Sequence, residues 1–177
     1  MKKILFVLAI IVIACTESNQ RILPEPKVGE QYLDGTVFYI FQPSDANFYV
    51  EGETHGLIVY NEDLPAVKWG CNIAQTSQME YGFGWGDYNT DYMLSICPTS
   101  EAAIASRTLG EDWYLPTTEE LQEIVKINLK IPGIDINQYY WSSNKGSSTF
   151  YAVRLKDGNI GEYNSNSTLP IRPVRKF

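Results

Sequence analysis

Apolar residues fall into short runs that predict β-strands toward both ends of the chain. Residues 36–41 and 56–60 are β-branched and aromatic runs bounded by Gly, Pro and Asp, a pattern typical of strands. Four further strands are expected at residues 139–143, 149–155, 159–163 and 171–175. The pair Asp157-Gly158, between the second and third of these, predicts a tight hairpin turn.

Two helices are predicted between the two sets of strands. Thr99 or Ser100 can cap the first helix, which Gly110 would end in a left-handed conformation. Thr117 and Glu120 have the spacing of a capping box at the start of the second. The apolar face of the second helix consists of Leu121, Ile124, Val125 and Asn128. Helices grouped between strand sets, without βαβ alternation, indicate an α+β fold with a largely antiparallel sheet.

Residues 61–98 show no sustained hydrophobic period and are rich in Gly, Asn, Asp and aromatic residues. The segment Gly82–Gly86 is rich in glycine, but it lacks the Lys-Ser/Thr of a phosphate-binding loop and no helical pattern follows it. We therefore expect one long, ordered loop region with a functional role.

The N-terminus predicts export. A basic start, Met1–Lys3, precedes an apolar run from Ile4 to Ala14 that is too short to span a membrane and has the form of a signal peptide. The last residues of this run, followed by Cys15, resemble a bacterial lipobox, which predicts lipid attachment at Cys15. The alternative is an ordinary secretory signal with a chance cysteine.

This interpretation divides the chain into three parts. They are a signal peptide at residues 1–14, a flexible tether at 15–27 and a single domain at 28–177. The tether holds two prolines and no apolar period. Thr16 follows Cys15 at the position where an inner-membrane retention signal would have Asp. We therefore expect the lipid to anchor the protein in the bacterial outer membrane, with the domain facing the periplasm or the surface.

Charge and composition narrow the classes of partner. The net charge of −7 would become −9 on loss of Lys2 and Lys3 with the signal, so the surface repels phosphate backbones and anionic lipids. We therefore expect no nucleic-acid partner, and membrane contact only through the lipid. The 12 tyrosines, 7 phenylalanines and 4 tryptophans suit either a β-rich core or a surface that stacks on sugars.

The two remaining cysteines, Cys71 and Cys97, are predicted to form a disulfide, since export places them in an oxidising compartment. The alternative is a pair of buried free thiols. The sequence holds one histidine, His55, and no closely spaced cysteine pair, so no zinc site is expected.

Six blocks of residues, in this order, resemble one known family. They are Val28–Tyr32 with Gly35–Tyr39, His55–Ile58, Gly84–Thr90, Asp112–Thr117 with Glu120-Leu121, Tyr140–Ser143 and Val174–Phe177. Together they are similar to the C-terminal domain of the bacterial collagen-like adhesin Lcl, a domain family of largely unknown function.

The resemblance implies a fold similar to C-type lectins and to formylglycine-generating enzymes. In that fold the first and last strands pair, and long loops present the binding surface. The founding adhesin is associated with adhesion and with sulfated glycans, but the acidic character of this chain argues against carrying over the preference for sulfate. The motif positions of Trp113 and Trp141 indicate core residues.

The long loop region contains the candidate ligand-binding residues. They are Trp85, Asp87, Tyr88, Asn89, Asp91 and Tyr92. Aromatic faces stack on the apolar C–H surfaces of sugars, and carboxylates and amides bind paired hydroxyls. No cofactor is expected, because Asp87, Asn89 and Asp91 begin like an EF-hand that lacks its Gly and Glu. The alternative is an irregular calcium site at Asp87 and Asp91.

No catalytic site is expected, because no nucleophile motif is found and a lone histidine is more often structural. Cys71 and Cys97 do not match the reactive pair of the formylglycine-generating enzymes. We therefore predict a lipid-anchored binding module for a glycan or a surface protein. The alternatives are a structural subunit of an adhesin or pilus assembly, and an enzyme with a deep pocket at His55.

Overall fold

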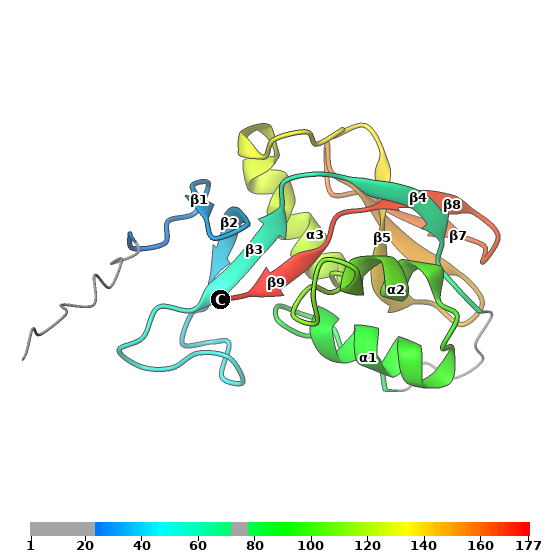
Figure 1. Ribbon diagram of the computed structural model, residues 1–177, viewed down its shortest axis with the longest axis horizontal. Coiled ribbons are helices and arrows are strands. Elements are labelled where there is room, and N and C mark those ends of the chain that lie inside the picture. Colours follow the sequence, from blue (N-terminus) through cyan, green and yellow to red (C-terminus); the bar gives the residue numbers. More distant parts are fainter. Residues whose placement is uncertain (1–23, 72–77) are drawn as a thin grey trace, which may run out of the picture.

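The computed structural model describes residues 24–71 and 78–177. The predicted signal peptide, Cys15 and residues 16–23 of the tether lie outside the described residues, whereas residues 24–27 have no regular secondary structure. The fold is α+β with antiparallel sheets, as predicted (Figure 1). The described residues contain three α-helices and one 3-10 helix, whereas two helices were predicted. None of the helices in the described ranges is long and apolar enough to cross a membrane.

The largest sheet has four strands in the order β1-β2-β3-β9. Its members are β1 (Gln31–Tyr32), β2 (Gly35–Ile40), β3 (Gly56–Tyr60) and β9 (Val174–Lys176). Side chains of β2 and β3 are buried on both faces of the sheet: Val37 and Ile58 pack with Trp113, and Phe38 and Leu57 pack in the main core. Burial on both faces explains the continuous apolar runs that predicted these strands.

The other strands form two smaller antiparallel sheets. One pairs β4 (Leu64–Lys68) with β8 (Thr168–Ile171), and the other contains β5 (Tyr139–Lys145), β6 (Phe150–Arg154) and β7 (Ile160–Tyr163). The predicted hairpin is confirmed between β6 and β7, where Gly158 has a φ of 72° and the Arg154 amide donates to the Asn159 carbonyl at 2.9 Å.

The expected strand at residues 171–175 is instead two strands. The chain leaves β8 at Arg172-Pro173 and enters β9, and the route from β3 to β4 makes the same change of sheet beside it (Figure 1). At this crossing the Tyr60 amide donates to the Pro173 carbonyl at 2.9 Å, but Pro173 has no N–H to donate in return, so the strand ladder is interrupted where the chain changes sheet. The last strand, β9, therefore shares a sheet with β1, but its hydrogen-bonded neighbour is β3.

Both predicted helices are confirmed. Ser100 caps α2 (Glu101–Arg107), with its side chain accepting from the Ala103 amide. Thr117 and Glu120 form the predicted capping box of α3 (Thr118–Ile124). The chain then tightens into the 3-10 helix η1 (Val125–Lys130), in which the Asn128 side chain donates to the Leu155 carbonyl at 2.6 Å.

The prediction that residues 61–98 form one loop is wrong. This region contains β4 and an eleven-residue helix, α1 (Gly86–Ile96), which directly follows the glycine-rich segment. The buried residues of α1 are Gly86, Asn89, Thr90 and Met93. They have helical spacing, but three of the four are small or polar, so they give no hydrophobic period.

Two apolar clusters pack the helices against the sheets. One lies between α3 and the four-stranded sheet and includes Leu121, Ile124 and Val174. The other lies beneath α1 and α2, against the two smaller sheets, and includes Trp69 and Trp141. Trp113 and Trp141, predicted as core residues, are 3% and 0% exposed, so neither is available as a ligand contact.

Candidate functional site

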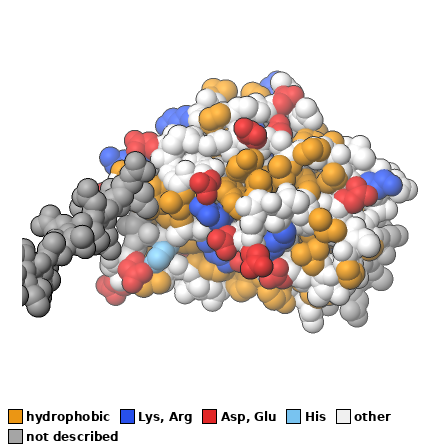
Figure 2. All heavy atoms as spheres, in the orientation of Figure 1, with side chains coloured by type: hydrophobic (Ala, Val, Ile, Leu, Met, Phe, Trp, Pro, Cys, Tyr) orange, Lys and Arg blue, Asp and Glu red, His pale blue; other side chains and the backbone are white. Residues whose placement is uncertain are grey.

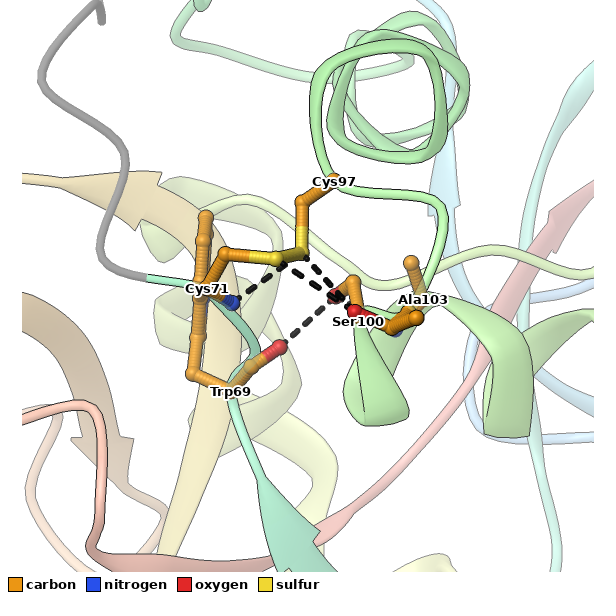
Figure 3. Close-up of a disulfide and its surroundings, with 6 residues drawn as sticks. Trp69, Cys71, Cys97, Ser100 and Ala103 are labelled. Carbon is orange, nitrogen blue, oxygen red and sulfur yellow. Dashed lines mark hydrogen bonds between the residues drawn. A yellow bond between two sulfur atoms is a disulfide. The ribbon is translucent and has the colours of Figure 1, made fainter.

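Helix α1 carries most of the candidate ligand residues, and a disulfide fixes its C-terminal end. Cys97 is the C-cap of α1 and is bonded to Cys71, with 5.8 Å between the two Cα atoms (Figure 3). Beside it, the Ser100 hydroxyl donates to the Trp69 carbonyl at 2.7 Å. Gly70, with a φ of 146°, allows this close approach, because a Cβ there would lie 2.9 Å from the Ser100 Cα. The predicted disulfide is thus present.

A buried carboxylate fixes the other end of α1. Glu120 is fully buried, and its Oε1 accepts a hydrogen bond from the Gly84 amide at 2.7 Å and one from the Tyr114 hydroxyl at 3.3 Å. Its Oε2 accepts from the Thr117 amide at 2.8 Å. Burial raises the pKa of Glu120 to about 7, although these hydrogen bonds act in the opposite direction. One side chain therefore ties the glycine-rich segment to the start of α3.

Asn89 is a structural residue of this helix. Its side chain is buried, accepts from the Glu80 amide at 2.8 Å, and donates to the Glu80 carbonyl at 2.8 Å and to the Ser143 hydroxyl at 3.1 Å. All of its principal hydrogen-bonding capacity is used inside the protein. Asn89 therefore holds the chain before Tyr81 in place, and the structure does not bring it to the surface with the other candidates.

The aromatic candidates form a continuous row. We define the aromatic row as Phe48, Trp85, Tyr88 and Tyr92. The ring centroids are 5.3 Å apart for Phe48 and Trp85, 6.0 Å for Trp85 and Tyr88, and 6.5 Å for Tyr88 and Tyr92. Tyr88 is 45% exposed, and Trp85 and Tyr92 are partly exposed. A helix brings residues three or four apart onto one face, which explains how these rings come together.

The acidic candidates lie on the neighbouring face of α1 and are paired with bases. Arg107 Nη2 lies 2.9 Å from Asp87 Oδ1 and 2.5 Å from Asp91 Oδ1, and Lys176 Nζ lies 2.9 Å from Asp87 Oδ2. Arg107 also donates to the carbonyls of Glu111 and Trp113. Figure 2 shows acidic and basic side chains gathered on this face of the molecule, over the region where β9 and the neighbouring ends of α1 and α2 lie in Figure 1.

These ion pairs occupy the two carboxylates, Asp87 and Asp91, of the alternative calcium site. Burial alone would raise the pKa of Asp87, but hydrogen bonds from Lys176 and Arg107 outweigh it and lower the pKa, so the carboxylate stays ionised. The Arg107 guanidinium lies where a metal shared by Asp87 and Asp91 would have to bind. No group of three or more His, Cys, Asp or Glu side chains that could hold a metal ion is found within residues 24–71 and 78–177.

Two cavities meet at Phe48, on the loop between β2 and β3. The first, of about 250 Å³, lies between this loop and the glycine-rich segment and is lined by Ser44, Asp45, Ala46, Asn47, Phe48, Gly82, Phe83 and Trp85. The second, of about 280 Å³, is lined by Phe41, Asn47, Phe48, Val50, His55, Lys176 and Phe177. The first cavity therefore places carboxylate, amide and hydroxyl groups at the Trp85 end of the aromatic row.

His55 makes structural contacts. Its Nε2 lies 2.7 Å from Glu53 Oε2 and its Nδ1 lies 3.3 Å from the Phe177 carbonyl, so both ring nitrogens have partners. The hydrogen bond with Glu53 raises the pKa of His55. The residues that line the adjacent cavity include no carboxylate, serine or cysteine, so they do not provide the acid, base and nucleophile of a hydrolytic site.

Several residues of this region were not predicted from the sequence. Phe48 and the polar residues before it precede β3 by a turn-rich segment with no hydrophobic period, and Arg107 belongs to a different helix from its partners. The capping-box spacing identified Glu120, but it gave no sign that the carboxylate is buried and also binds the Gly84 amide. Only the helical spacing of Trp85, Tyr88 and Tyr92 could have indicated a common face.

Comparison with known proteins adds no relative to this description. No family model matches the chain, and no curated protein matches it. Function must therefore be inferred from the residues of the site itself.

Proposed function

We propose that the chain is an exported, lipid-anchored carbohydrate-binding module with a C-type-lectin-like fold, related to the C-terminal domain of the adhesin Lcl. The six sequence blocks and the α+β architecture support the family and fold. The observation that carries the function is the aromatic row, which presents three partly exposed rings along one helix beside a polar cavity.

The chemistry of the row suits sugars. An aromatic side chain at a surface leaves apolar area in water, and several together mark an interaction site. A sugar covers such rings with its C–H face and leaves its hydroxyls at the edges. At the Trp85 end, Ser44, Asp45 and Asn47 line the first cavity. Asp45 Oδ2 already accepts from the Tyr39 hydroxyl and the Gln42 amide, whereas the Ser44 hydroxyl and the Asn47 amide could bind those sugar hydroxyls.

A glycan array with the full-length protein in detergent micelles tests this function. We expect binding to at least one glycan, and a strong loss of that binding in Trp85→Ala. Tyr81→Ala is the matched control, since Tyr81 is 50% exposed but lies outside the aromatic row, and it should bind as the unaltered chain does. Circular dichroism would confirm that both variants fold.

Two results on the array would contradict the assignment of the aromatic row as a carbohydrate site. If no glycan binds, or if Trp85→Ala binds normally, the row is not a carbohydrate site. Binding of a protein partner that Trp85→Ala abolishes would assign the row to protein recognition, and self-association without any ligand would favour a structural subunit.

Replacing Cys15 by Ala tests the proposed anchor. Because the lipid would supply the membrane affinity, we expect the variant to appear as unlipidated protein outside the membrane fraction, with the mass of the lipid missing. Membrane fractionation and mass spectrometry measure both effects. An unchanged mass and unchanged membrane association would rule out lipid attachment at Cys15.

A further inference from the structure

We propose that the ligand is a linear, uncharged polysaccharide and that an internal stretch of it lies along α1, with successive sugar units on successive rings of the aromatic row. This inference rests on the proposed function and specifies its ligand. It depends on the spacing of the rings, on their orientation and on the charge beside them.

The row is too long for a single sugar. Trp85, Tyr88 and Tyr92 have consecutive centroid distances of 6.0 and 6.5 Å, and four residues of helix advance by about 6 Å. One pyranose covers about one aromatic ring. A ligand that contacts all three rings must therefore contain several linked units, extended along the helix axis.

The ring orientations favour a ribbon-like chain. The planes of Tyr88 and Tyr92 differ by 4°, so these two rings are parallel, whereas the Trp85 ring is nearly perpendicular to Tyr88, at 85°. A straight chain can place the flat faces of two units on two parallel rings without bending. The polar cavity at the Trp85 end can then bind the hydroxyls of a further unit, through side chains such as Ser44 and Asn47.

The charged groove beside the row argues against anionic glycans. A groove of about 520 Å³ runs along the other side of Asp87 and Asp91 and is also lined by Leu94, Arg107, Glu111 and Asp112. Four of the lining residues are acidic. Arg107 pairs with Asp87 and Asp91, Lys176 lies 2.9 Å from Asp87, and Arg175 lies 4.0 Å from Asp112, so four acids against three bases leave one negative charge in excess. A sulfated or uronate-rich chain on the row would lie beside this excess of negative charge.

Titration calorimetry with the full-length protein in detergent micelles tests this inference. The probes are linear gluco-, xylo- and manno-oligosaccharides from one to six units, with neutral dextran and dextran sulfate as the uncharged and anionic pair. For a sugar that binds, we expect the affinity to rise at least about tenfold from one unit to six, equivalent to about 1.4 kcal/mol. Dextran sulfate should bind more weakly than neutral dextran or not at all.

Two variants separate the parts of the row. Tyr88→Ala should weaken binding of the hexasaccharide and leave binding of the single sugar nearly unchanged, whereas Trp85→Ala should weaken both. Tyr81→Ala, the matched exposed tyrosine, should change neither.

The outcomes distinguish this inference from the proposed function. Affinity that depends on Trp85 but not on chain length, or that is higher for dextran sulfate, would overturn the linear, uncharged ligand and leave a carbohydrate site in place. If no sugar binds at any length, both the inference and the proposed function fail.

Discussion

The carboxylate of Glu120 belongs to the first turn of α3, yet it also accepts the Gly84 amide of the segment that begins α1. Gly86 lies equally close, since a Cβ there would be 2.7 Å from Glu120 Oε2. A larger side chain at position 86 would therefore displace either α1 or the carboxylate. At the scale of one residue, the position of the aromatic row depends on a group that no ligand touches.

Glu120 should make folding stability depend on pH. Burial raises its pKa from 4.5 in the unfolded chain to about 7 in the folded protein, so the folded protein holds this proton more tightly. The stabilisation is fully present below about pH 4.5 and is lost as the pH rises through 7, a change of about 3 kcal/mol. Urea unfolding at pH 5 and pH 8 measures it.

Glu120→Gln should remove most of this dependence, because the amide is neutral at every pH. Exposed Glu111→Gln is the control and should keep the pH dependence of the unaltered chain. Equal free energies of unfolding at pH 5 and pH 8 in the unaltered chain would contradict the prediction.

Residue identity alone predicted part of the site. The helical spacing of Trp85, Tyr88 and Tyr92 is visible in the sequence, and so is the Thr117–Glu120 capping box. Burial is not visible: Asn89 resembles an exposed loop residue, and only the fold shows that its amide binds Glu80. The identity of a polar side chain does not show whether water or protein atoms will make its hydrogen bonds.

Helix α1 is the element that the hydrophobic pattern failed to predict, and its attachments explain why it is stable. Its buried face holds Gly86, Asn89 and Thr90, which give no apolar period. The Thr90 hydroxyl donates to the Gly86 carbonyl at 2.7 Å and accepts from the Leu115 amide at 3.0 Å. Tertiary hydrogen bonds, Glu120 and the disulfide thus replace the usual apolar stripe.

Loss of the disulfide should destabilise the fold and loosen α1. Cys71 and Cys97 are 26 residues apart, and a loop of this size contributes about 3.5 kcal/mol in the chain-entropy account. We expect the free energy of unfolding of the double variant Cys71→Ser/Cys97→Ser to be lower by about this amount. Urea unfolding measures the difference.

Reduction provides the matching control. Dithiothreitol should lower the stability of the unaltered chain and leave that of the double serine variant unchanged. Insensitivity of the unaltered chain to full reduction of the bond would show that α1 does not depend on it.

The crossing between sheets joins the two halves of the molecule through a buried ion pair. Arg172 is 0% exposed, and its Nη2 lies 2.7 Å from Asp63 Oδ1, whereas its Nη1 donates to the Tyr60 carbonyl at 3.0 Å. The Tyr140 hydroxyl donates to Asp63 Oδ2 at 2.9 Å. Arg172 and Asp63 therefore form a close ion pair inside the protein.

Asp63→Ala should destabilise the whole fold by about 3 kcal/mol, because it leaves the Arg172 charge buried without its partner. The double variant Asp63→Ala/Arg172→Met removes both charges and should recover much of that loss. Chemical unfolding of the two variants measures the difference. A single variant within about 1 kcal/mol of the unaltered chain would show that water reaches the guanidinium.

At the scale of the whole molecule, the sequence predicted the α+β class and most strand positions, because those strands are buried and apolar. It did not predict that residues 168–176 divide between two sheets. Pairing partners come from segments far apart in the chain, and a run such as Thr168–Lys176 has the same pattern whether it joins one sheet or two.

The crossing also sets the order in which the chain can fold. Arg172 and Tyr60 are 112 residues apart, and strands from the last ten residues complete the pairing of β3, which also pairs with β2, and provide the partner of β4. Closing such a long loop costs entropy before any contact is gained, and contacts of this separation slow folding. We therefore expect the N-terminal part of the chain to complete its sheets only once the C-terminal strands are available; if the chain is exported as proposed, it would stay incompletely folded until translocation ends.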